Sequence, residues 1–183
     1  MADSYQRVSI GTQNVCQQVV TMSDNGDPIT YAVGKALQAQ NLWICTAESC
    51  TGGLISHRLT NVPGSSGYVL GGVVTYANRS KQELLKVREE TLIAYGAVSP
   101  QTAGEMALGA LALFGADVAV SVTGIAGPGG GSAEKPVGLV YAAVALKGGI
   151  VRMERNVWSG DRESIKQQTA TRALEMVLDA VSA

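Results

Sequence analysis

The sequence has few of the residues that build metal centres and disulfide frameworks. It holds one histidine, His57, and three cysteines in 183 residues, and no two of the cysteines form a C-x-x-C pair. We therefore predict no structural zinc site, no other metal and no cofactor. The odd number of cysteines suits reduced thiols in the cytosol rather than a set of disulfides.

Long apolar runs and a large excess of one charge are also missing. No run reaches membrane-spanning length, the polar N-terminus lacks the apolar region of a signal peptide, and the formal net charge is -1. We therefore expect a cytoplasmic protein with no membrane partner and no nucleic-acid partner. The 46% of hydrophobic residues is enough for one α/β domain with a substantial core.

The chain divides into an extension and one domain. Residues 1–27 show no firm periodicity and end in a cluster of turn-forming residues, so we interpret them as a mobile N-terminal extension. Residues 28–183 form the predicted domain, in which short apolar runs alternate with helical patterns. The predicted strands are 42–46, 68–77, 116–124 and the two arms that flank the hairpin "KGG" at 147–149.

The predicted helices complete a layered fold. They begin at Pro28, Cys50, Asn78, Glu89, Pro100 and Asp161, with Asn78 as an N-cap and an apolar stripe along the last helix. The run 68–77 is apolar throughout, which is typical of a strand covered on both faces. Because hairpin partners are antiparallel, we predict a three-layer α/β/α sandwich on a mixed, mostly parallel five-stranded sheet.

Polar residues gather where three of the predicted strands end. These segments are 46–53, 75–81 and 123–136, and open α/β sheets bind ligands at the carboxyl ends of their strands. In "TAESCTGG" (46–53), Ser49 is either part of a polar turn or a nucleophile. The thiol of Cys50 is a less favoured nucleophile, since it has no obvious partner.

A serine nucleophile needs a base that accepts its hydroxyl proton. His57 lies eight residues along the same predicted helix, about 12 Å away, and is interpreted as a helix-surface residue. Lys81 follows the end of a different strand and is the best-placed base. Taken alone, however, its position is typical of an ordinary solvated lysine. Burial, a helix N-terminus and the neighbouring Arg79 would each lower the pKa of Lys81. The glycine-rich loop after Gly124 offers backbone N–H groups to a phosphate or oxyanion, or is simply structural.

Taken together, these segments resemble the CinA C-terminal domain family. The resemblance runs in the family's order over about residues 28–181. It is carried by "TAESCTGG" (46–53), "GGVVTYANRSK" (71–81), "GAVS" (96–99), "SVTGIAGPGGGSAEKPVGLVY" (121–141) and "SGDRESIK" (159–166). The resemblance implies the short standalone form, without the pyrophosphatase domain that precedes it in longer CinA proteins.

The resemblance also implies a reaction and a set of site residues. Characterised members are nicotinamide-nucleotide amidohydrolases, which cleave the carboxamide of nicotinamide mononucleotide without metal and serve pyridine nucleotide salvage. Ser49 matches the nucleophile, Lys81 the base and Tyr76 an active-site partner. A homo-oligomer is expected. The residues expected to bind substrate are Glu48, Thr51, Gly52, Gly53, Thr123, Gly124, Gly127, Gly129 and Arg162.

Some assignments stay open at this stage. Glu48 is either a cap or a ribose contact, and the oxyanion donors lie either in Thr51–Gly53 or at the start of the glycine loop. Lys166 stands where the family usually has arginine, which would weaken a bidentate phosphate contact. The alternative functions are a nucleotide-binding module that has lost turnover and a purely structural partner protein.

Overall fold

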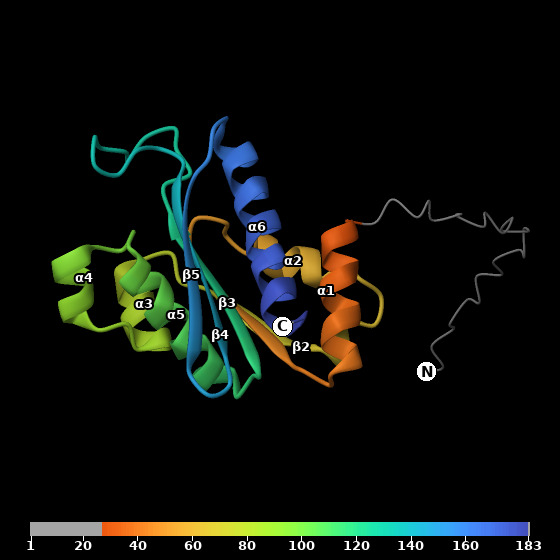
Figure 1. The fold of residues 1–183 in the computed structure, drawn as a ribbon. Helices are drawn as coiled ribbons and strands as arrows, with labels where there is room; N and C mark the ends of the chain where they lie inside the picture. The colour runs from red at the N-terminus through yellow and green to blue at the C-terminus, as the bar shows by residue number, and fades with distance from the viewer. Residues whose placement is uncertain (1–26, 183) are drawn as a thin grey trace, which may run out of the picture.

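The computed structural model describes residues 27–182, which form three layers around one sheet (Figure 1). All of the predicted extension except Asp27 lies outside the described residues. The strands are β1 (Ile44–Glu48), β2 (Val69–Val74), β3 (Val118–Gly124), β4 (Leu139–Leu146) and β5 (Ile150–Val157). The helices are α1 (Pro28–Ala39), α2 (Leu54–Thr60), α3 (Asn78–Leu85), α4 (Glu89–Tyr95), α5 (Pro100–Phe114) and α6 (Arg162–Ser182), with a 3-10 turn at Ser65–Gly67.

The sheet is mixed, and its strand order is β2-β1-β3-β4-β5. The pairs β1–β2 and β1–β3 are parallel, whereas β3–β4 and β4–β5 are antiparallel. Four strands therefore point the same way and β4 alone runs against them. The predicted fold class is confirmed, including the hairpin between β4 and β5.

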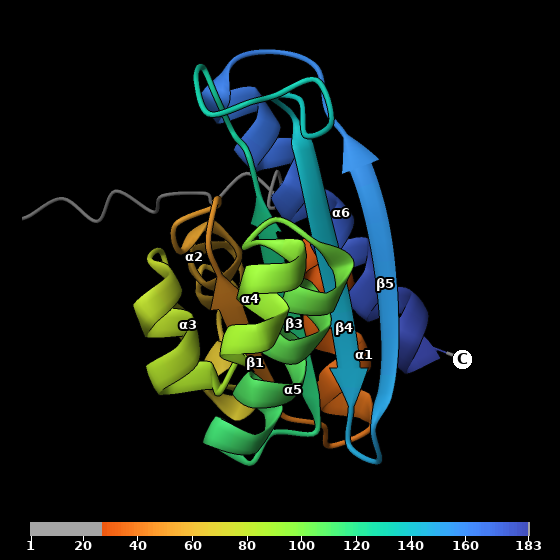
Figure 2. The ribbon, with the colours of Figure 1, turned by 90° about the vertical axis from the view of Figure 1, so that its left-hand side faces the viewer.

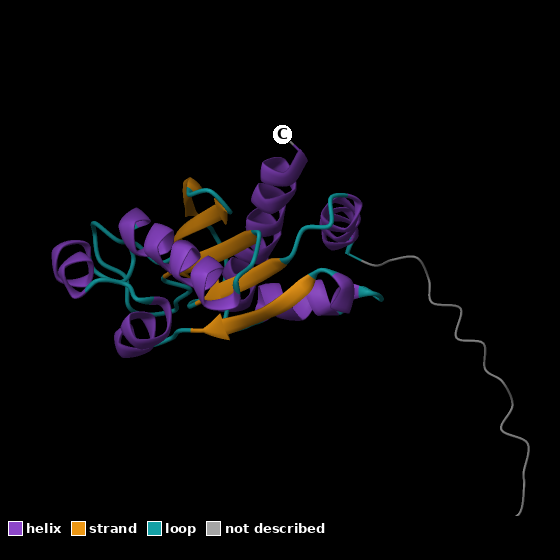
Figure 3. Ribbon diagram, turned by 90° about the horizontal axis from the view of Figure 1, so that it is seen from below, coloured by secondary structure: helices purple, strands orange, loops and turns teal. Residues whose placement is uncertain are grey.

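Helices cover both faces of the sheet (Figures 1 and 3). Helices α1, α2 and α6 share the larger apolar core with one face, and α5 with α3 packs on the other. The predicted stripe of α6 is buried as expected, at Ile165, Thr169, Ala173, Val177 and Val181. Burial of this stripe, rather than helix propensity, accounts for most of the stability of such a helix.

Three predictions about local structure were wrong. Strand β2 lies at the sheet edge, and its burial alternates between half-buried and exposed residues instead of being complete. Helix α2 begins at Leu54 rather than at Cys50, because a turn separates it from β1. Asn78 is the first residue of α3 and Ala77 precedes it, with no side-chain cap.

The strand order brings the three polar segments together. β1, β2 and β3 are parallel neighbours, so their carboxyl ends meet at one edge of the sheet, beside the glycine-rich loop after β3 (Figure 2). Among the described residues, no helix is both long enough and apolar enough to span a bilayer.

Candidate active site

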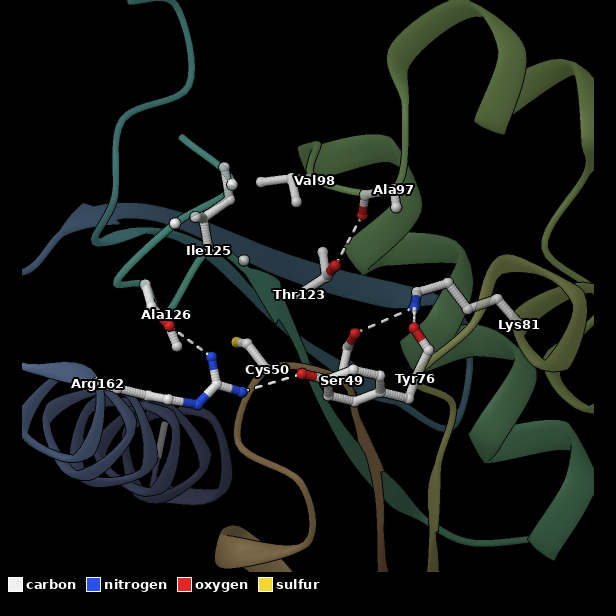
Figure 4. Close-up of a pocket in the computed structure, with 14 residues that line it drawn as sticks. Ser49, Cys50, Tyr76, Lys81, Ala97, Val98, Thr123, Ile125, Ala126 and Arg162 are labelled. Atoms are coloured by element: carbon white, nitrogen blue, oxygen red, sulfur yellow. Dashed lines mark hydrogen bonds between the residues drawn. The ribbon is translucent and has the colours of Figure 1, made fainter. Parts of the chain in front are cut away.

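A pocket of about 270 Å³ lies at this edge of the sheet (Figure 4). Its wall comes from the ends of β1 and β3, the segments after β2 and α4, helix α3, the glycine loop and the start of α6. The lining residues are Ser49, Cys50, Tyr76, Lys81, Ala97, Val98, Thr123, Gly124, Ile125, Ala126, Gly127, Gly129, Gly130 and Arg162.

Ser49 and Lys81 meet in this pocket although 32 positions separate them. Lys81 Nζ lies 3.1 Å from Ser49 Oγ, 2.6 Å from the carbonyl oxygen of Thr75 and 3.4 Å from that of Tyr76. Lys81 is buried, with only 1% of the residue's surface exposed. A neutral amine has two N–H bonds and one lone pair, so two carbonyl acceptors leave the lone pair for the Ser49 hydroxyl.

Burial is the main reason why Lys81 is an unusual lysine. Desolvation lowers its pKa to about 8, and the Cys50 thiol acts weakly in the opposite direction. The predicted direction of the pKa is therefore confirmed. Arg79 is not a cause, since its side chain is 85% exposed and pairs with Glu83 at 2.6 Å.

Glu48 organises the turn that carries Ser49. Its buried carboxylate accepts hydrogen bonds from the hydroxyl of Thr51, from the backbone N–H groups of Gly53 and Ile55, and from both the N–H and hydroxyl of Ser56. These donors include the first N–H groups of α2, which need an acceptor and attract a negative charge. Glu48 is thus the cap of α2.

Four of the residues expected to bind substrate, Glu48, Thr51, Gly52 and Gly53, belong to this hydrogen-bonded turn and its cap. None of the four lines the pocket, and Glu48 is fully buried with its carboxylate turned toward α2. The N–H of Gly53 binds Glu48 and that of Gly52 binds the carbonyl of Ser49. Neither of these two N–H groups is left for an oxyanion, whereas that of Thr51 has no hydrogen-bond partner within residues 27–182.

Gly124, by contrast, has a backbone N–H without a partner within residues 27–182. Alternate N–H groups of β3 point to β1, as that of Val118 does toward Trp43, and the last such rung joins the Ser49 N–H to the Val122 carbonyl at 3.1 Å. The N–H of Gly124 is the next in this series, where β1 has already turned away. It faces the Ser49 turn from the pocket wall.

Arg162 crosses the opposite side of the pocket (Figure 4). Its guanidinium donates to the carbonyl of Gly127 at 2.7 Å and to the hydroxyl of Tyr76 at 3.0 Å. Tyr76 therefore contributes its backbone carbonyl to Lys81 and its hydroxyl to Arg162. In the described part of the chain, no hydrogen bond uses the N–H groups of Gly127, Gly129 and Gly130.

Comparison with known proteins agrees with this architecture. Residues 27–181 match the CinA C-terminal domain. The chain belongs to the CinA C-terminal domain family. It is 53% identical over 150 residues to nicotinamide-nucleotide amidohydrolase PncC of Enterobacter agglomerans, with 82% of this chain and 92% of that protein covered.

Other relatives of this CinA-family chain differ in length. A CinA-like protein of Akkermansia muciniphila is 52% identical over 155 residues, which cover 85% of this chain and 37% of that protein. The chain thus spans little more than a third of such longer relatives. The crystal structure of competence/damage inducible protein CihA from Agrobacterium tumefaciens superimposes with a TM-score of 0.82 at 47% identity, covering 85% of this chain and 94% of that one.

Sequence reasoning missed part of the wall of this CinA-family pocket. Ala97 and Val98 follow α4 and have no polar side chain to mark them, although they fall in the quoted "GAVS" segment. Thr123 lines the pocket as predicted, and its hydroxyl donates to the Ala97 carbonyl at 2.7 Å. Lys135 of the glycine loop donates to the carbonyl of Val98 at 2.8 Å. These two hydrogen bonds hold Ala97 and Val98 in place in the pocket wall.

The other candidate residues from the sequence do not take part in the contact between Ser49 and Lys81. His57 is exposed on α2 and contacts Asn61. Lys166 lies outside the pocket lining and pairs with Glu163 at 3.5 Å, so the departure from the family's arginine falls beyond the pocket wall. Cys50 lines the pocket, but burial raises the pKa of its thiol to about 12. Residues 27–182 hold no group of three or more His, Cys, Asp or Glu side chains placed to bind a metal.

Proposed function

We propose that this chain hydrolyses the carboxamide of nicotinamide mononucleotide to nicotinate mononucleotide and ammonia. The observation that carries the proposal is the 3.1 Å contact between buried Lys81 Nζ and Ser49 Oγ at the carboxyl end of the sheet. The PncC relative supports the substrate class. In this proposal the product returns to pyridine nucleotide salvage.

The acylation half begins with the neutral form of Lys81. Its lone pair accepts the hydroxyl proton of Ser49 as Oγ attacks the carboxamide carbon, and the C=O bond pair moves onto oxygen. The tetrahedral intermediate collapses by breaking the C–N bond. Lys81 delivers its proton to the departing nitrogen, which leaves as ammonia, and a nicotinoyl ester remains on Ser49.

The deacylation half repeats these transfers with water. Lys81 takes a proton from water, the hydroxide adds to the ester carbon, and the proton returns to Ser49 Oγ as the C–O bond breaks. Nicotinate mononucleotide leaves and the enzyme is restored. The carbonyls of Thr75 and Tyr76 hold the Lys81 amine in one orientation throughout, because they accept its two N–H groups.

The Gly124 N–H is our choice for the oxyanion donor. It has no partner in the described part of the chain and continues the ladder rung that ends at Ser49, whereas the N–H groups of Gly52 and Gly53 are engaged. A preorganised backbone donor of this kind stabilises a developing negative charge without reorganisation. The proposed oxyanion donor therefore lies at the start of the glycine loop.

The phosphate of the substrate is assigned to the Arg162 side. Arg162 offers a forked cation, and the N–H groups of Gly129 and Gly130 are unused by residues 27–182. This side lies across the pocket from Lys81, so the ring amide and the phosphate can be held at the same time (Figure 4).

One assay tests the proposal. Purified protein is incubated with nicotinamide mononucleotide or free nicotinamide, and ammonia release is measured. The expected result is release from the mononucleotide and little from nicotinamide. Tight binding of the mononucleotide without ammonia release would instead identify a nucleotide-binding module that has lost turnover. Absence of both binding and release would reject the substrate class.

A further inference from the structure

The charged side chains that line the pocket are both cationic. Among the lining residues these are Lys81 and Arg162, and no aspartate or glutamate takes part. The carboxylate nearest in sequence to Ser49, that of Glu48, is buried and turned toward the start of α2. The pocket therefore offers no counter-ion to a second positive charge placed near Lys81.

The surroundings of Lys81 confirm that it has no anionic partner within residues 27–182. Its amine contacts the Ser49 hydroxyl and two backbone carbonyls. The Cys50 thiol faces it from the turn after β1, and Arg162 faces the pocket from α6. On its own helix, Arg79 and Glu83 pair with each other and are mainly exposed. A charge placed near Lys81 can therefore shift its equilibrium between the ammonium form and the neutral amine.

We propose, on the basis of the function proposed above, that the positive charge of the substrate's pyridinium ring drives the proton from Lys81. The substrate then generates the base that attacks it through Ser49. The site would consequently select quaternary pyridinium carboxamides over neutral aromatic carboxamides of the same shape.

The distances support this coupling. Attack requires the carboxamide carbon within about 3 Å of Ser49 Oγ, and the ring is bonded directly to that carbon. Since Oγ lies 3.1 Å from Lys81 Nζ, the ring charge comes within roughly 5–6 Å of the amine. At that separation, with an effective dielectric constant of about 20, a positive charge raises the acid dissociation constant of an ammonium roughly one hundred- to three hundredfold.

The phosphate opposes this effect only weakly. It is assigned to Arg162, on the far side of the pocket from Lys81 (Figure 4), where the guanidinium balances its charge. A ligand with the same phosphate and amide but a neutral ring separates the two contributions. The C-nucleotide in which a 3-carbamoylphenyl ring replaces the pyridinium is such a ligand.

Proton release on binding measures the coupling directly. Ser49→Ala protein binds each ligand without turnover, and calorimetry in buffers of different ionisation enthalpy counts the protons released. Starting from the Lys81 pKa of about 8, a hundredfold rise in the acid dissociation constant releases about 0.7 of a proton at pH 7.5. We expect this with nicotinamide mononucleotide, and close to none with the neutral-ring ligand. Adding Lys81→Met should abolish the difference.

Equal proton release with both ligands would overturn the proposal. A second readout uses the wild-type enzyme, in which kcat for nicotinamide mononucleotide should follow a lower apparent pKa than kcat/KM, since kcat reports the complex. Coincident pH profiles would also contradict it. Failure of the coupling leaves ammonia release intact, whereas absence of ammonia release in the wild type refutes the proposed function itself.

Discussion

The two sides of the pocket use their backbone groups in opposite ways. On the Ser49 side, formed by the turn 49–53 and Lys81, hydrogen bonds to Glu48 and to local carbonyls engage the Thr51 hydroxyl, the Lys81 amine and the N–H groups of Gly52 and Gly53. On the glycine-loop side, formed by residues 124–131 and Arg162, several N–H groups have no partner in residues 27–182. Side chains held by such hydrogen bonds keep the reacting atoms in place, whereas N–H groups without a partner can bind a ligand. We therefore expect changes on the first side to lower kcat and changes on the second to raise KM.

Ser49→Ala should have the largest effect on the Ser49 side. Loss of the nucleophile is expected to reduce ammonia release by about a thousandfold or more, because no other group in the pocket replaces it. Binding of nicotinamide mononucleotide, measured by calorimetry, should change little. Ser66→Ala, an exposed serine far from the pocket, is the control. Retention of a tenth of wild-type turnover would contradict the assignment.

Glu48→Gln tests whether the network positions Ser49. The amide keeps one acceptor oxygen where the carboxylate had two, so kcat should fall about ten- to hundredfold with KM nearly unchanged. The free energy of unfolding should fall by about 2–4 kcal/mol, since buried N–H groups at α2 lose their acceptor. Glu83→Gln, exposed on α3, is the matched control. A rise in KM alone would point to a ribose contact instead.

Arg162→Ala tests the glycine-loop side. Charge-assisted contacts of a guanidinium are worth about 1.5–3 kcal/mol, so KM for nicotinamide mononucleotide should rise about ten- to hundredfold while kcat stays within a few-fold. Arg79→Ala removes an exposed cation outside the pocket and should change neither constant. If kcat falls as much as KM rises, Arg162 holds the catalytic groups through Tyr76 and the two sides are not separable.

The smallest effect concerns stability. The pKa of Lys81 is lower in the folded protein than the 10.5 of a free lysine, so the unfolded chain binds more protons between pH 8 and 10.5 and stability rises with pH there. Relative to Lys81→Met, the wild type should gain about 2 kcal/mol of unfolding free energy between pH 7.5 and 9.5. Chemical denaturation at the two pH values measures this. A constant difference would show that Lys81 is not desolvated.

Much of the fold could be predicted because its determinants are local. The hairpin at 147–149 and the stripe of α6 follow from turn residues and periodicity. The start of α2 could not be predicted in this way, since a side chain at the end of β1 caps it across the turn. The edge position of β2 depends on strand order, which an apolar run does not encode.

The candidate site also has residues that the sequence could predict and residues that it could not. Ser49 and Lys81 lie in polar segments that follow strands, and the rule that strand ends meet at one edge was enough to group them. Arg162 was proposed separately, from its place at the start of the last helix. Ala97 and Val98 were missed because apolar wall residues have no polar side chain to mark them. The role of Glu48 became clear only from the hydrogen bonds that its carboxylate accepts from the turn and from α2.

The central claim is that neutral Lys81 is the base for Ser49, and the pH dependence of kcat/KM tests it most directly. Only the unprotonated amine can accept a proton, so kcat/KM of the wild type should rise with pH through an apparent pKa near the value of about 8 that burial gives Lys81. Lys81→Arg, whose guanidinium stays protonated, should be inactive across the same range. A flat profile between pH 6 and 9.5, or substantial activity in the arginine variant, would contradict the account.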